Sequence, residues 1–200
     1  MNKISLLFIL SVLITCSAYA QDDIKITHAP YLQNLGENEV TVVWTANKPS
    51  IGWVELAPDD GTHYYQTERP KFFNAKNGIK LTSTVHSVHL TGLKPGTRYR
   101  YRVYSQEVLS HVGWRVIYGN VAATSVYGKQ PLTFLTSDHG RQSVNFAMVN
   151  DIHGKSDVLE KLVSHCDLKK TDMFLFNGDM VSIFNNEKEI FEGFMDKATE

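Results

Sequence analysis

The chain has 200 residues, of which 42% are hydrophobic and 20% are charged, and its formal net charge is -1 at pH 7. This is the composition of an ordinary globular protein, and the near-neutral charge gives no indication of a nucleic-acid or membrane-surface partner. The sequence contains no internal repeat or low-complexity tract, and its length allows one domain and part of another.

Residues 1–20 have the pattern of a secretory signal peptide. Lys3 gives a positive start, Ile4–Ile14 is an apolar run, and Ala18-Tyr19-Ala20 is a small-residue cleavage site. An uncleaved membrane anchor is the alternative, but a span needs about 20 apolar residues. We therefore expect cleavage after Ala20, export to a periplasm or beyond, and no stable membrane anchor.

The two cysteines, Cys16 and Cys166, do not predict a disulfide. Acylation of Cys16 in a lipoprotein is disfavoured, because threonine precedes it where glycine, alanine or serine is usual. Once the leader is removed, a single thiol cannot form an internal bridge. We interpret Cys166 as a small apolar residue on the helix expected between the two polar motifs described below.

Residues 24–137 have the short alternating strands and turn residues of an all-β sandwich. Val40–Thr45 alternates and contains Trp44, and Gly52–Leu56 precedes a Pro58-Asp59-Asp60-Gly61 turn. Further strands are expected at residues 86–90, 99–103 and 131–136. On residues 86–90, His86 and His89 face opposite ways, so they are not expected to bind one ligand together.

The run Leu93-x-Pro95-Gly96-Thr97-x-Tyr99 resembles fibronectin type III domains. The resemblance implies that Tyr99 is a tyrosine corner, with its hydroxyl returning to the backbone a few residues upstream, and that Trp44 fills the core. The entrance segment Ala29-Pro30-Tyr31-Leu32-Gln33 is similar to the front domain of purple acid phosphatases.

Residues 105–130 are too long and too apolar for a solvated loop. We predict an extended hairpin that packs on the following domain or borders its site. His111 is its one candidate functional residue, but no partner supports it. Residues 138–144 are expected to be a polar linker, in which Asp138 and His139 are adjacent and therefore point apart.

Residues 145–200 begin a second domain of α/β type. The apolar runs Phe146–Val149 and Met173–Phe176 flank a helical pattern, as in a right-handed βαβ unit. Polar residues follow both runs: Asp151 and His153 after the first, and Asp179 after the second. Since the carboxyl ends of parallel strands meet at one crevice, these three side chains are expected to converge.

Two carboxylates and an imidazole form a donor set that suits zinc, manganese or iron. In extended backbone, Asp151 and His153 would point the same way and reach one ion, while Asp179 would reach a second. Asn150 and Asn177, each just before a motif, are expected to hold the ligands by hydrogen bonds. An Asp-x-His or Gly-Asp pair alone is common, so the prediction of a metal site depends on both pairs following the strands of one βαβ unit.

The segment resembles the start of calcineurin-like metallophosphoesterases, whose opening motifs are Asp-x-His and Gly-Asp-x-x-Asp. The resemblance implies that Asp151 and His153 bind the first of two divalent or trivalent ions and that Asp179 bridges both. Ser182 stands where the second motif ends in Asp. Purple acid phosphatases have glycine at the position of His153 and tyrosine at that of Ser182, so their tyrosine ligand is not expected here.

The later family motifs, which supply the rest of the second metal site and the general acid, are not found between Val181 and Glu200. We therefore expect the chain to be the N-terminal part of a longer enzyme, with the general acid beyond Glu200 and no catalytic group besides the metal ligands. The hypothesis is an exported two-metal hydrolase of phosphate esters, either mono- or diesters. The alternative is an exported β-sandwich binding module with a degenerate phosphoesterase remnant.

Overall fold

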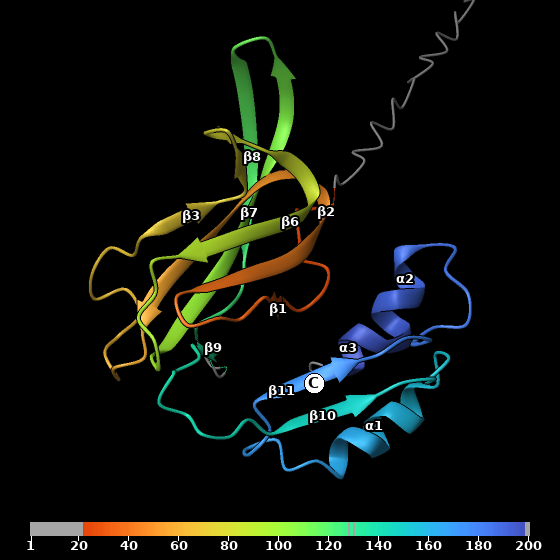
Figure 1. Ribbon diagram of the computed structural model, residues 1–200. Helices are drawn as coiled ribbons and strands as arrows, with labels where there is room; N and C mark the ends of the chain where they lie inside the picture. Colours follow the sequence, from red (N-terminus) through yellow and green to blue (C-terminus); the bar gives the residue numbers. More distant parts are fainter. Residues whose placement is uncertain (1–21, 128, 130, 199–200) are drawn as a thin grey trace, which may run out of the picture.

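The computed structural model describes residues 22–127, 129 and 131–198, and they form two parts (Figure 1). The first is a β-sandwich and the second a small α/β unit. Between β9 and β10, residues 136–145 form neither helix nor strand. The leader predicted for residues 1–20 lies outside the described residues. Within the described residues, no helix is long and apolar enough to cross a bilayer.

The sandwich is built on one long strand that contributes to both of its layers. Its named strands are β1 Tyr31–Gln33, β2 Glu39–Pro58, β3 Lys71–Phe73, β6 Thr82–Thr91, β7 Arg98–Val112, β8 Arg115–Ala123 and β9 Leu132–Leu135, with a small β4 Ala75–Lys76 and β5 Ile79–Lys80 ribbon beside them. The first half of β2 pairs with β1 and β6, and its second half pairs with β3 and β7, with Ser50 and Ile51 still paired to β6.

The bend in β2 is the main departure from the predicted strands. Val40–Thr45 and Gly52–Leu56 were expected as separate strands, yet both belong to β2. The pairing with β6 shifts register between Thr45 and Ser50. Pro49 lies inside this irregularity, where a missing backbone N–H is tolerated.

Side chains from both layers meet in one apolar core. Trp44 is almost fully buried and its Nε1–H donates to the Ser105 hydroxyl at 2.9 Å. The Tyr99 hydroxyl accepts a hydrogen bond from the backbone N–H of Lys94 at 3.0 Å. The fibronectin type III-like sandwich, the core position of Trp44 and the tyrosine corner at Tyr99 are thus confirmed.

His86 is a fully buried polar residue in this core. Its Nε2 lies 2.9 Å from the Ser50 hydroxyl and its Nδ1 lies 3.2 Å from the Asn74 amide. Burial lowers the pKa of His86 from 6.5 to about 4, because the charged imidazolium would lose its hydration. His89 is exposed on the opposite face and pairs with Glu39, so the two histidines do separate as predicted.

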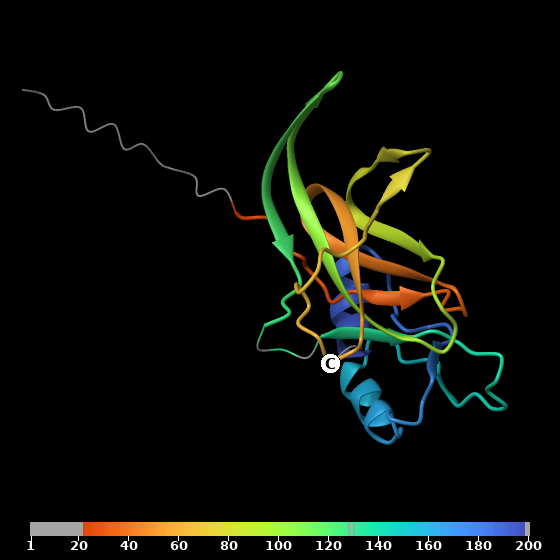
Figure 2. The same ribbon diagram turned by 90° about the vertical axis from the view of Figure 1, so that its left-hand side faces the viewer.

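Strands β7 and β8 form a hairpin that extends well beyond the sandwich (Figures 1 and 2). The predicted hairpin is therefore present. The hairpin does not pack on the described α/β unit, because it points away from that unit in every view; whether it borders the site of the following domain stays a prediction. Two register shifts near Val108 bend the ribbon, as bulges do.

The α/β unit starts from two parallel strands, β10 Phe146–Val149 and β11 Met173–Phe176, which pair in register. The helix α1 Ser156–Ser164 connects them, and α2 Glu187–Ile190, the π-helical η1 Phe191–Met195 and α3 Asp196–Ala198 follow. Both strands have the bounds that the apolar runs predict.

One face of this small sheet is covered and the other is open. Val149 and Phe176 pack on a core of Ile152, Leu159 and Met180, and Phe194 of η1 meets Phe176 edge to face. The opposite face exposes apolar side chains of both strands, namely Phe146, Met148, Met173 and Leu175. Parallel sheets normally have both faces covered, so this face is available for further packing.

The ends of the helices differ in how they are capped, and Cys166 lies outside the helix on which it was expected. Lys155 is the N-cap of α1, and it provides no side-chain cap hydrogen bond. Cys166 is half-buried just beyond the C-cap His165, not on the helix itself. By contrast, Asn186 caps α2 and accepts a hydrogen bond from the Lys188 backbone N–H at 3.0 Å.

Candidate metal centre

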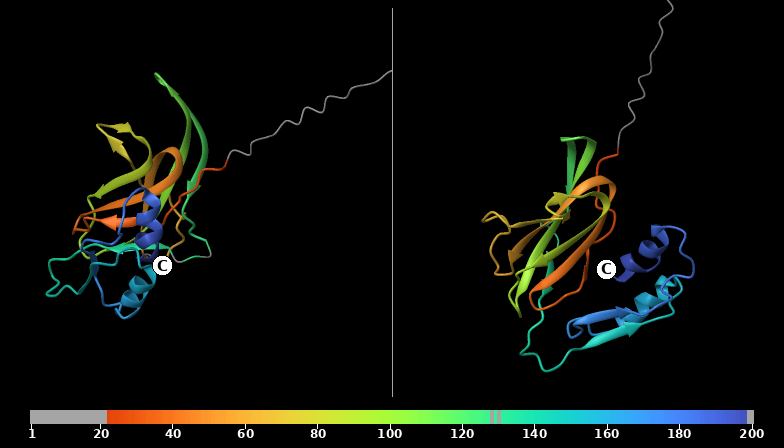
Figure 3. Two further views of the ribbon diagram at one scale, coloured as in Figure 1. Left: turned by 90° about the vertical axis from the view of Figure 1, so that its right-hand side faces the viewer. Right: turned by 45° about the horizontal axis from the view of Figure 1, so that its top comes forward.

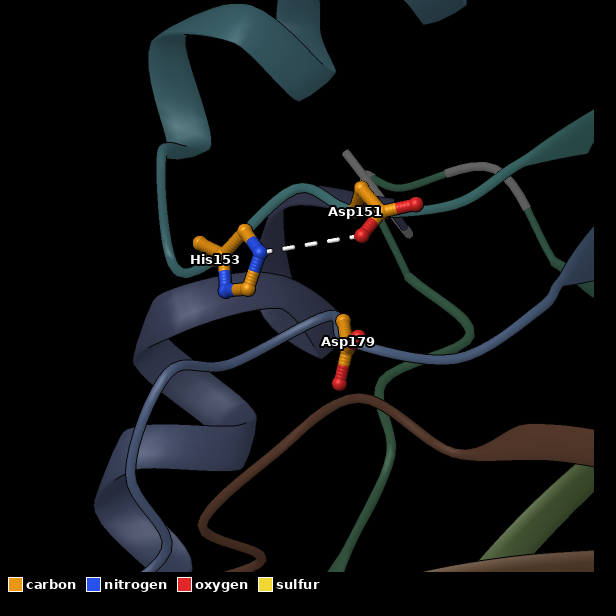
Figure 4. A group of neighbouring side chains, drawn as sticks. All are labelled: Asp151, His153 and Asp179. Carbon is orange, nitrogen blue, oxygen red and sulfur yellow. Dashed lines mark ion pairs between the residues drawn. The ribbon is translucent and has the colours of Figure 1, made fainter.

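The three predicted ligands lie on two loops that leave the carboxyl ends of β10 and β11 (Figure 4). Asp151 and His153 follow β10, and Asp179 follows β11. One ligand atom from each residue can be chosen such that all lie within 4.8 Å of one another. The structure therefore brings together the residues that the parallel strands were expected to bring together.

The backbone conformation at the three ligands differs from the one expected from the sequence. Extended backbone through residues 151–153 was expected, but φ is +57° at Asp151, +52° at His153 and +46° at Asp179. Ile152 between them is buried in the core of the α/β unit. The two ligands point toward one another because both are left-handed around a buried anchor.

Left-handed backbone at non-glycine residues is uncommon and costs about 1–2 kcal/mol per residue, less for Asp and Asn. Only five such residues occur in the described part of the chain, and the other two are Asn34 and Asn77. Strained backbone of this kind collects at functional sites. That three of the five are the predicted ligands singles out these loops.

Hydrogen bonds between the loops fix their relative position. The backbone N–H of His153 donates to the Asp179 carbonyl at 2.8 Å, and that of Gly154 donates to the Met180 carbonyl at 2.8 Å. The Ser182 hydroxyl donates to the His153 carbonyl at 3.1 Å. The separation of the ligand backbones is therefore set by the fold and not by the side chains alone.

Ser182 stands out in the sequence only as a departure from a motif, and no spacing rule predicts its hydrogen bond. Its residue type gives one retrospective signal, since serine hydroxyls in turns commonly bond to nearby backbone. Met180 is a second residue that was missed. It is buried against Ile152 and so anchors the Asp179 loop.

The supporting asparagines differ from each other. The Asn150 amide donates to the Asp151 carboxylate at 2.5 Å, which orients that side chain as expected. Asn177 lies at the end of β11, where its backbone N–H donates to the Val149 carbonyl at 2.9 Å. The role expected for the Asn177 side chain stays a prediction.

The donor set fits a metal ion. His153 Nε2 lies 3.7 Å from an Asp151 carboxylate oxygen, and all three residues are exposed. Atoms that bind one zinc ion at about 2.1 Å lie at most about 4.2 Å apart. Small side-chain rotations would bring this cluster into that range, with two hard oxygens and one imidazole nitrogen as donors.

Comparison with known proteins supports the fold of both parts. Residues 28–118 match the family described as Purple acid Phosphatase, N-terminal domain. Among solved structures, the chain is similar to the purple acid phosphatase from yellow lupin (Lupinus luteus) seeds, with a TM-score of 0.56 and 16% identity. That match covers 84% of this chain, more than the sandwich alone occupies, and 32% of the lupin chain.

The present chain thus spans about a third of the length of the lupin enzyme. The sandwich is also similar to the FN5 domain of Drosophila Lar, at 14% identity and a TM-score of 0.35 over 57% of this chain and 96% of that one. The fn3 domain of human collagen alpha-1(XX) gives 16% identity and 0.35 over 64% and 98%. No curated protein matches the sequence.

Proposed function

We propose that this chain provides the front domain and the first metal ligands of an exported, metal-dependent hydrolase of phosphoric esters. One observation carries the proposal: Asp151, His153 and Asp179 converge at the carboxyl ends of two parallel strands, each in left-handed backbone. The match of residues 28–118 to the front domain of phosphatases supports the same class of enzyme.

Each residue of the site has a distinct task in this proposal. Asp151 and His153 would hold the first of two ions, and the carboxylate of Asp179 would help to hold both ions. Divalent or trivalent ions of iron, manganese or zinc supply Lewis acidity toward phosphoryl oxygens and activate water at neutral pH. Asn150 keeps the Asp151 carboxylate aimed at the site.

The contribution of the protein to the proposed chemistry is to hold the metal ligands in position. The interloop hydrogen bonds of His153, Gly154 and Ser182 hold the ligands apart at a fixed distance, so the site is organised before any substrate arrives. The exposure of the cluster leaves room for a phosphate ester to approach from solvent. His153 and Ser182 replace the glycine and tyrosine of purple enzymes, so a colourless centre without a tyrosine ligand is proposed.

A second candidate function is an exported β-sandwich binding module that carries a degenerate phosphoesterase remnant. The serine at position 182, where the related motif ends in Asp, favours it. The two proposals differ in metal binding, which is expected for the hydrolase and not for the degenerate remnant.

Metal titration of the chain that begins at Gln21 tests the proposal. We expect Mn²⁺ to bind weakly, because three ligands are only part of a two-metal site, and we expect Asp179→Asn to weaken binding at least tenfold. Asp167→Asn is the matched control, because Asp167 is an exposed carboxylate of the same unit that lies outside the cluster. Equal binding by both variants would contradict the assignment. We also expect this chain alone to be inactive as a phosphatase, because it carries only part of the proposed site, and phosphatase turnover by it would contradict that expectation.

A further inference from the structure

The outer part of the β7–β8 hairpin, residues 108–121, is called the finger here. It projects from the sandwich away from the α/β unit (Figures 2 and 3). The side chains at its tip are apolar and exposed to solvent: Trp114 is 103% exposed and Val112 is 75% exposed. Four more large apolar side chains of the finger are exposed, namely Leu109, Ile117, Tyr118 and Val121.

These apolar side chains are not confined to one face of the ribbon. Val112 pairs with Arg115 and Ser110 pairs with Ile117, and cross-strand partners share a face. Ile117 and Tyr118 are both exposed, and as consecutive residues of β8 they face opposite ways. A flat protein surface could cover only one of these faces, whereas a medium that surrounds the tip covers both.

The charged side chains of the finger are of one sign, positive. Residues 108–123 contain no Asp or Glu, although the whole chain has 21 acidic residues. Arg115 follows Trp114 directly, and His111 lies across the turn as the partner of Val116. At the base, Glu107 is buried and paired with Lys48 at 2.8 Å, so its charge is neutralised. An apolar tip with a cationic border is complementary to an anionic amphiphile.

We propose that the finger is a reversible membrane-contact element whose tip enters the interface of an anionic phospholipid bilayer. Trp114 takes the headgroup level that tryptophan prefers, Val112 lies among the upper acyl chains, and Arg115 binds lipid phosphate. Gly113, with φ +58°, makes the tight turn that presents these neighbours together.

The depth of entry is limited by the backbone. The outer edges of a two-stranded ribbon carry unpaired N–H and C=O groups, which hydrocarbon does not tolerate. Contact is therefore confined to the tip, at a depth of about 5–10 Å. Such an element holds the sandwich at a surface, while the α/β unit, which carries the candidate metal ligands, lies on the side away from the finger (Figures 2 and 3).

Vesicle binding by the chain that begins at Gln21, which contains every described residue, tests this proposal. Sedimentation with phosphatidylcholine vesicles containing 30% phosphatidylglycerol gives the partition coefficient, roughly fivefold higher than with phosphatidylcholine alone if one Arg115–phosphate contact contributes about 1 kcal/mol. We expect Trp114→Ala to lower binding at least tenfold and Arg115→Glu to remove the preference for the anionic vesicles. Brominated lipids should quench the fluorescence of the wild type and not that of Trp114→Ala.

Ile79→Ser is the matched control, because Ile79 is an exposed apolar residue on β5, away from the finger. It should bind vesicles like the wild type. Urea unfolding should give the same stability for all variants, since each replaced side chain is exposed. The proposal is overturned if no variant or wild type binds vesicles, if Trp114→Ala binds as well as the wild type, or if the finger instead drives self-association or binds only a protein.

Discussion

Asp151, His153 and Asp179 each adopt a backbone conformation that most residues avoid. The strain is offset by the interloop hydrogen bonds and by the burial of Ile152 and Met180. A fold that accepts this cost at three candidate ligands keeps their donor atoms close before any ion arrives. The identity of the ligands followed from their positions after the strands, whereas their conformation did not, because it depends on the buried Ile152 between them.

His86 makes a separate prediction about stability at the scale of one residue. Its folded-state pKa of about 4 is below the unfolded value of 6.5, so the unfolded chain binds the proton first as pH falls. The stability that the folded protein gains from keeping His86 neutral is fully present above about pH 6.5 and is lost progressively as the pH falls toward 4. We expect a loss of about 3 kcal/mol across this window.

Urea unfolding between pH 7 and pH 4 checks this expectation. His86→Gln should flatten the pH dependence, while His89→Gln should retain it, because His89 is exposed on the opposite face of β6. An unchanged slope in His86→Gln would show that another group carries the proton uptake.

At the scale of elements, β10 and β11 were predicted with their observed bounds because each is a short apolar run that ends at an asparagine. The bend in β2 was not predicted, because Asn47-Lys48-Pro49 has the composition of a turn. The structure accommodates Pro49 at a register shift and continues the strand. The finger was predicted as a hairpin, but its direction depends on twist and bulges that no local pattern reveals.

The start of α1 offers a test at this scale. Lys155 occupies the N-cap and leaves the first backbone N–H groups of the helix without a side-chain acceptor. Lys155→Ser should stabilise the α/β unit by about 1 kcal/mol, since serine accepts such hydrogen bonds. Thermal unfolding followed by circular dichroism measures the change, and Lys161→Ser, within the last turn of the same helix, should not stabilise. A Lys155→Ser variant no more stable than the wild type would contradict this account of the cap.

At the scale of the whole molecule, the α2 to α3 segment lies on the sandwich side of the α/β unit (Figures 1 and 3). The His28 ring stacks on Phe191 at 3.9 Å, and its Nδ1 lies 3.0 Å from the Asp196 carboxylate. These contacts were not foreseen, because they join segments 163–168 residues apart with no shared motif. They place the sandwich beside the α/β unit, which carries the candidate metal ligands.

Features that arise from local sequence patterns could be predicted, whereas features that depend on contacts between distant segments could not. Parallel strands with polar residues at their carboxyl ends predict a site from local patterns alone, and the fibronectin-like motif predicts a sandwich. The relation between the two parts depends on surface complementarity between His28 and η1, and the hydrogen bond of Ser182 depends on loops that meet only in the folded chain. Neither leaves a periodic signal in the sequence.

The most direct test of the metal centre is a crystal structure of the chain grown with Mn²⁺ and measured at the manganese absorption edge. We predict an anomalous peak in contact with Asp151, His153 and Asp179 together, and no such peak in the Asp179→Asn variant. A structure in which these side chains diverge, or in which manganese binds elsewhere and leaves them unliganded, would contradict the proposal.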